Sequence, residues 1–142
     1  MELTKQFSEQ QFERALESWE WIGLDGLAPQ FTSLFGDVFL VGDDGAWWFL
    51  DTFEGQLTRE WDDADGLRAA LGTEKGQDRY LMAGLAFAAH EQRGLRLEDG
   101  QIYAYAPPPV LSGSFAAEDI KVFGFVAVVN SAGQIHAKIR NA

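Results

Sequence analysis

The sequence contains no cysteine, which excludes disulfide bonds and thiolate metal ligands. Two histidines among 142 residues are too few for a histidine-rich metal site. No run of 18 apolar residues occurs, so no membrane-spanning helix is predicted. The first residues, MELTKQFSEQ, also lack the apolar stretch of a signal peptide. We therefore expect a soluble, cytoplasmic protein with no metal and no cofactor.

Basic residues are scarce as well: 11 Lys and Arg face 22 Asp and Glu, for a net charge of −11. Such a chain is a poor ligand for nucleic acid or anionic lipid, which both need cationic contacts. It suits a basic protein partner, because complementary fields speed the encounter. Nine acidic residues fall between Asp37 and Asp65, where Arg59 is the only basic residue. A charge kept for solubility alone would explain the same balance.

What the sequence does contain is a stretch of short apolar runs separated by turns rich in Gly and Asp. The runs span residues 38–41, 46–50 and 56–61. This pattern predicts a small antiparallel β-meander at about residues 38–61. Alternation places Trp47 and Phe49 on one side of the middle strand, and Trp48 and Leu50 on the other. Either helices cover both faces, or one face carries an aromatic binding surface.

Helical patterns flank the meander on both sides. Ser8 and Gln11 form a capping-box pattern that begins an amphipathic helix within residues 1–27. A short helix is expected from Asp62 or Asp63 to Gly72, and a longer helix from Thr73 to about Arg93. We expect the longer helix to cover one face of the meander.

The C-terminal third is harder to interpret. Residues 101–105 alternate as a short strand, and Pro107–Pro109 favours an extended segment. Residues 122–139 fit either a helix or a hairpin, and we favour a strand at Lys121–Val122 followed by a helix. The chain is therefore predicted to be α+β, with residues 1–142 forming a single domain in which the meander packs against helices.

Motifs for catalysis are missing. The sequence has no phosphate-binding loop, no zinc-protease motif, no nucleophile elbow and no dinucleotide fingerprint. Asp43-Asp44-Gly45 does not match a calcium loop, because Leu40 and Gly42 stand where ligands are required. We predict that the chain is not an enzyme. The alternative is a small-ligand or enzymatic site that uses His90 and His136 in a polar cluster with Asn130 and Gln134, although each histidine also fits a purely structural role.

Four short motifs resemble a known bacterial family, within a likeness that covers residues 30–140. They are Gly-Asp-Val-Phe at 36–39, Trp-Phe-Leu-Asp at 48–51, Pro-Pro-Val-Leu at 108–111 and Gly-Gln-Ile-His at 133–136. The family is the C-terminal domain of type VI secretion DNase-immunity proteins, which often follows a GAD-like domain. Here the N-terminal residues 1–27 leave no room for that second domain. By architecture alone, the layout also resembles the Smi1/Knr4-like immunity superfamily.

The resemblance implies a small α+β protein that binds and neutralises a cognate nuclease toxin. An acidic surface would compete there with phosphate for a basic groove. The candidate partner-binding residues are Asp43, Asp44, Glu54, Asp62, Asp63 and Asp65, with Trp48 as an aromatic anchor. Each also fits a structural role, as a turn carboxylate, a helix cap or a core tryptophan. A homodimer formed through an uncovered sheet face is a further alternative.

Overall fold

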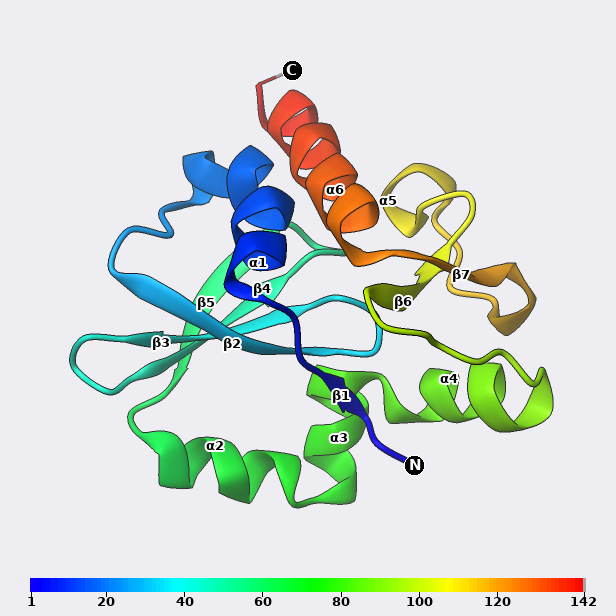
Figure 1. The fold of residues 1–142 in the computed structure, drawn as a ribbon, viewed down its shortest axis with the longest axis horizontal. Coiled ribbons are helices and arrows are strands. Elements are labelled where there is room, and N and C mark those ends of the chain that lie inside the picture. The colour runs from blue at the N-terminus through cyan, green and yellow to red at the C-terminus, as the bar shows by residue number, and fades with distance from the viewer. Residues whose placement is uncertain (142) are drawn as a thin grey trace.

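A five-stranded antiparallel sheet, with strand order β1-β2-β3-β4-β5, forms the centre of the computed structural model, which describes residues 1–141 (Figure 1). The strands are β1 (Thr4–Lys5), β2 (Leu27–Ser33), β3 (Val38–Gly42), β4 (Trp47–Asp51) and β5 (Gln56–Trp61). The last three are the predicted meander, with nearly the predicted bounds. The two strands before it were not predicted, because Pro29 and Gln30 interrupt the apolar pattern of β2.

Alternation divides the meander into two apolar faces, as predicted. Phe39 of β3 lies opposite Phe49 of β4, and Leu40 lies opposite Trp48. Val38, Leu40 and Leu50 belong to one buried cluster, whereas Phe39, Phe49 and Trp61 belong to another. Trp47 and Trp48 are each half-buried, and they pack on opposite faces.

Helices pack on both of these faces. The cluster around Leu40 includes side chains from α1 (Glu9–Leu16), the 3-10 helix η1 (Glu17–Ile22) and α6 (Phe125–Arg140). The cluster around Phe39 includes side chains from α2 (Ala64–Leu71) and α3 (Glu74–Leu81). The predicted caps Ser8, Asp63 and Thr73 each accept a hydrogen bond from a first-turn amide. Both faces of the meander are thus covered by helices, so neither is the uncovered face that the homodimer alternative requires.

The prediction of a single long helix from Thr73 to about Arg93 is wrong, because the helix is interrupted at Met82. This residue adopts a left-handed conformation, with φ 51°, which is uncommon for a side chain larger than glycine. The segment forms α3, then α4 (Ala83–Phe87), then a π-helical turn η2 (Ala88–Gln92). The break lets α3 cover the meander while Ala86 and Ala89 pack into a different cluster.

That cluster surrounds a second, two-stranded sheet. It pairs β6 (Gln101–Tyr105) with β7 (Ile120–Gly124), and the connection between them contains α5 (Pro109–Ser112) and the 3-10 turn η3 (Ala117–Asp119). The strand predicted at 101–105 and the C-terminal strand followed by a helix are both confirmed, although β7 is longer than expected. Pro107–Pro109 is not extended throughout, since Pro109 begins α5.

Side chains of η1 donate hydrogen bonds to backbone carbonyls of α6 and so join the N-terminal and C-terminal helices. The fully buried Trp19 donates a hydrogen bond from Nε1 to the carbonyl of Val129 at 2.8 Å. Ser18 Oγ donates to the carbonyl of Asn130 at 2.6 Å. Gly133 allows this approach, because a Cβ atom there would lie 2.8 Å from Trp19 Nε1. None of the helices within residues 1–141 has the length and apolar character needed to cross a membrane.

We predict that Gly133→Ala destabilises the fold by about 1–3 kcal/mol, because the rigid indole of Trp19 must move to admit a methyl group. Gly124→Ala is the matched control, since a Cβ atom at Gly124 meets nothing within 4 Å and its φ is −70°. Urea unfolding followed by tryptophan fluorescence measures both variants. Equal stability of the two would show that the close packing at Gly133 is unimportant.

Candidate functional site

Three of the predicted acidic residues meet at one end of the meander. Asp43 and Asp44 form the turn after β3, and Asp62 follows the last residue of β5, which pairs with the first residue of β4. Arg59 lies between them, with Nη1 2.6 Å from Asp62 Oδ1 and Nη2 3.8 Å from Asp44 Oδ2. All four side chains are exposed, so these ion pairs orient the carboxylates without removing them from water.

Trp48 belongs to the same end. It pairs with Arg59 across β4 and β5, and its indole packs beside the cluster that includes Leu40. A Cβ atom placed on Gly42 would lie 3.7 Å from Trp48 Nε1 and 3.0 Å from Asp44 Oδ1, so the indole nitrogen borders the turn. We call Asp43, Asp44, Trp48, Arg59 and Asp62 the acidic end.

Asp63 and Asp65 follow closely in the chain, but their carboxylates interact with groups of α2. Asp63 Oδ1 accepts a hydrogen bond from the amide of Gly66 at 2.8 Å, which caps the helix. Asp65 forms an ion pair with Arg68 one turn later. Asp43, in contrast, has no hydrogen bond or ion pair from its side chain to any part of residues 1–141.

Glu54 lies at the opposite end of the meander, in the turn between β4 and β5. It borders an outer hollow together with Phe115, His136 and Ile139. The structure thus divides the predicted partner-binding set. Most of its members lie at or next to the acidic end, whereas Glu54 lies among apolar side chains.

The two histidines are not brought together. His90 lies in η2, with Nδ1 3.0 Å from Glu91 Oε1, and lines a hollow with Arg96 and Leu97. His136 lies in α6, where its ring is buried and Nε2 is 3.0 Å from the carbonyl oxygen of Thr52.

The predicted polar cluster around His136 does not form either. Asn130 accepts a hydrogen bond from Gln134 at 2.6 Å and donates one to the carbonyl of Arg14 at 2.9 Å. These bonds face α1, whereas His136 bonds to the turn after β4. The residues within 1–141 contain no group of three His, Asp or Glu side chains placed to hold a metal ion.

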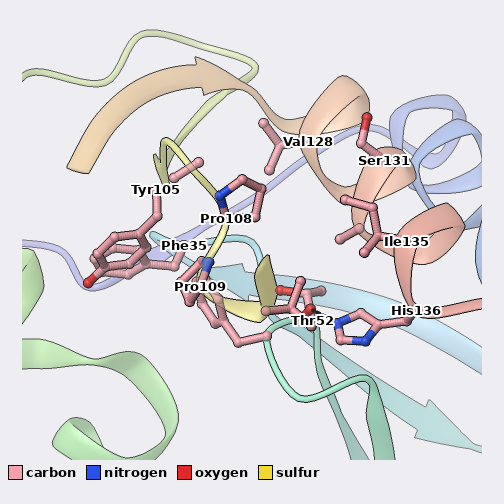
Figure 2. Close-up of a pocket in the computed structure, with 13 residues that line it drawn as sticks. Phe35, Thr52, Tyr105, Pro108, Pro109, Val128, Ser131, Ile135 and His136 are labelled. Atoms are coloured by element: carbon pink, nitrogen blue, oxygen red, sulfur yellow. Dashed lines mark hydrogen bonds between the residues drawn. The ribbon is translucent and has the colours of Figure 1, made fainter. Parts of the chain in front are cut away.

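Sequence reasoning missed a pocket between α6 and the proline-rich segment (Figure 2). It has a volume of about 80 Å³ and is lined on one side by Pro108 and Pro109, on another by Val128 and Ile135, with Thr52 nearby. The apolar spacing of 128, 132 and 135 along α6 was the available signal. This spacing indicates one apolar face of a helix, but not that the opposing side chains stop short of filling the space.

A buried carboxyl, that of Asp37, bonds to Thr52 in the wall of this pocket. Asp37 is fully buried, and its Oδ1 accepts two hydrogen bonds at 2.8 Å, from the amide and from Oγ1 of Thr52. Burial raises the pKa of Asp37 to about 8; the charge of Asp51 adds to this effect, and hydrogen bonds from Thr52 and Ser33 oppose it. Thr52 therefore connects Asp37 to His136, because its carbonyl bonds to the imidazole.

Comparisons with known proteins give a fold and no function. No family model matches the sequence, and no curated protein matches it either. Among solved structures, the chain is similar to Atu4351 from Agrobacterium tumefaciens, with a TM-score of 0.60 and 19% identity. The alignment covers 93% of this chain and 66% of that one, so this chain spans slightly less than two thirds of its neighbour's length. At this identity the likeness shows a shared α+β fold alone.

We predict that Asp37 makes the stability of the protein fall as pH rises. The folded-state pKa of about 8 lies above the ordinary value of 3.8, so the neutral carboxyl favours folding at low pH, and this contribution is lost as pH rises from about 4 to 8. The free energy of unfolding should decline by up to about 1 kcal/mol per pH unit relative to Asp37→Asn, which does not titrate.

Urea unfolding of both proteins at half-unit steps from pH 4.5 to 9 gives the difference curve. Subtracting the variant removes the contributions of the other carboxylates. Parallel curves would mean that Asp37 is ionised throughout this range.

Proposed function

We propose that this chain is an immunity-type binding protein, which neutralises a cognate nuclease toxin in the cytoplasm of the producing cell without catalysis. The observation that carries the proposal is the acidic end, where Arg59 pairs with the exposed carboxylates of Asp44 and Asp62, next to the exposed Asp43 and the half-buried Trp48. It presents charge of the sign that nucleic acid itself presents to a nuclease.

Electrostatics supports a basic partner. A nuclease binds its substrate through cationic residues that contact phosphates. Carboxylates at the acidic end would pair with those residues, and the net charge of −11 would draw the two proteins together. Arg59 pairs with Asp44 and Asp62, which favours orientations that present both carboxylates on the same surface.

Trp48 supplies an apolar contact beside the charges. Tryptophan is enriched among the residues that dominate binding energy, especially where neighbouring side chains exclude water. Its indole is already held against the sheet by the packing around Leu40, so binding orders little that is mobile.

The family resemblance supports the same function. Its four motifs come from separate parts of the chain, yet all of them contribute to the region around Thr52. Asp37 bonds to Thr52, Asp51 precedes it, and Pro109 and His136 line the pocket beside it. Each of the four motifs therefore contributes a residue close to Thr52.

The alternative small-ligand or enzymatic site gains no support from the placement of its residues. His90 and His136 line separate hollows, and the imidazole of His136 is buried against a backbone carbonyl. We assign neither histidine a chemical role.

The direct test is co-expression with the product of the adjacent gene, which the proposal expects to be a nuclease toxin. Cells that produce the chain in excess should survive induction of the toxin, and the purified proteins should form a complex. Death of cells that contain abundant folded chain would refute the proposal.

We predict that Asp43→Lys with Asp62→Lys weakens nuclease binding by tenfold or more, mainly through slower association. Glu98→Lys with Glu118→Lys is the matched control, because it makes the same charge change at exposed carboxylates next to the second sheet. Surface plasmon resonance at two salt concentrations measures both pairs. Equal losses would assign the effect to net charge and not to the acidic end.

We also predict that Trp48→Ala weakens nuclease binding by about thirtyfold, the effect of a central aromatic contact. Trp47→Ala removes the same half-buried side chain from the opposite face and should leave affinity within about threefold. Both variants are first checked for folding by circular dichroism. Similar affinities for the two would remove Trp48 from the interface.

A further inference from the structure

The pocket beside His136 is bordered by exposed apolar side chains. Val110, Leu111, Phe115 and Ile139 are 38%, 64%, 43% and 50% exposed. They are four of the seven large apolar side chains that are exposed within residues 1–141, so exposure is concentrated here and not scattered. Val110, Phe115 and Ile139 line the outer hollow next to the pocket, and Leu111 follows Val110 in α5.

The interior of the pocket suits an apolar group. Thr52 Oγ1 already donates to Asp37, and the carbonyl of Thr52 is paired with His136 Nε2. The hydroxyl of Ser131 points away from the space enclosed in Figure 2. Among the lining residues, the Tyr105 hydroxyl and His136 Nδ1 are the ring polar atoms with no hydrogen bond within residues 1–141. Most of the wall is apolar, so an apolar group fits the space better than a polar one.

Size and surroundings favour a protein over a free small molecule. A volume of about 80 Å³ is well below the roughly 300–1,000 Å³ of typical small-molecule sites. A molecule small enough to fill it would leave Phe115 and Ile139 exposed to water. A protein that inserts one side chain would cover them at the same time.

Glu54 places an exposed negative charge at the edge of this surface. Its exposed carboxylate shares the outer hollow with Phe115 and Ile139, and it has no ion pair within residues 1–141. Arg140, which follows Ile139 in the chain, lies instead over the ring of Trp21, 5.4 Å from its centre. An incoming cation would find an unpaired carboxylate beside an apolar surface.

We infer that this pocket and its apolar rim are a docking site for a partner protein, which inserts one apolar side chain and pairs a neighbouring Lys or Arg with Glu54. The site lies at the opposite end of the meander from the acidic end. It is independent of the proposed immunity function, because it would bind any partner that carries this pair of residues.

Three blocked dipeptides test this chemistry without knowledge of the partner: acetyl-Leu-Arg-amide, acetyl-Leu-Glu-amide and acetyl-Gly-Arg-amide. Each is titrated into the isotope-labelled chain and followed by amide NMR. The Leu-Arg peptide should shift the amides of Thr52, Phe53, Val110 and Ile135 and approach saturation. The Leu-Glu peptide should bind about two- to fivefold more weakly, which is the usual effect of one surface ion pair. The Gly-Arg peptide should not saturate.

Two variants locate the binding. Ala132→Leu places extra methyl groups in the pocket and should abolish the saturable response, whereas Ala127→Leu, on an exposed part of α6, should not change it. Glu54→Lys should reverse the preference between Leu-Arg and Leu-Glu. This change is at an exposed turn and therefore remains informative if Ala132→Leu does not fold.

The inference is overturned by an equal response to Gly-Arg, which would indicate nonspecific attraction to an acidic protein. It is overturned equally if the response persists in Ala132→Leu, or if no pocket amide shifts with any peptide. A concentration-dependent rise in mass that Phe115→Asp abolishes would assign the surface to a second copy of this chain and likewise reject the inferred partner.

Discussion

The buried carboxyl of Asp37 is the group on which the arrangement of this protein depends. It fixes the turn after β4, because both the amide and the hydroxyl of Thr52 donate to it. The carbonyl of Thr52 is thereby left to pair with His136, which ties α6 to the sheet. The amide of Asp37 itself donates to Ser33 Oγ, which closes the turn before β3. Through its amide and its carboxyl, Asp37 thus connects two turns of the sheet, and Thr52 extends the connection to the last helix. The buried carboxyl accepts two hydrogen bonds at Oδ1.

Local patterns predicted the meander and its two faces because they depend on alternation alone. They also predicted a cap at Thr73 and another at Asp62 or Asp63, of which Asp63 is the one observed; each cap bonds an amide three residues along the chain. The break at Met82 was not predictable, since the residues on both sides of it continue a helical spacing. A left-handed backbone conformation at a residue other than glycine is maintained by tertiary packing. At Met82 it lets Leu81 pack into one cluster while Ala86 and Ala89 pack into another.

The division of the acidic set was, in contrast, implied by the predicted topology. Asp43 lies in the first turn of an antiparallel meander and Glu54 in the second, and successive turns fall at opposite ends of the shared strand. The predicted residues could therefore not form one surface. The pocket could not be inferred in this way, because its walls come from α6, the proline-rich segment and the turn at Thr52, which are far apart in sequence.

The short pairing of β1 with β2 leaves most of one sheet edge uncovered. Only Thr4 and Lys5 pair with β2, so Leu27 to Phe31 form an open strand edge. Pro29 offers no amide there, and the side chain of Gln30 donates to the carbonyl of Ala28, which it covers. At the other edge, β5 carries the exposed side chains of Thr58 and Arg59. The β2 edge therefore disfavours the addition of a further strand through Pro29 and Gln30, and the β5 edge carries the charged side chain of Arg59.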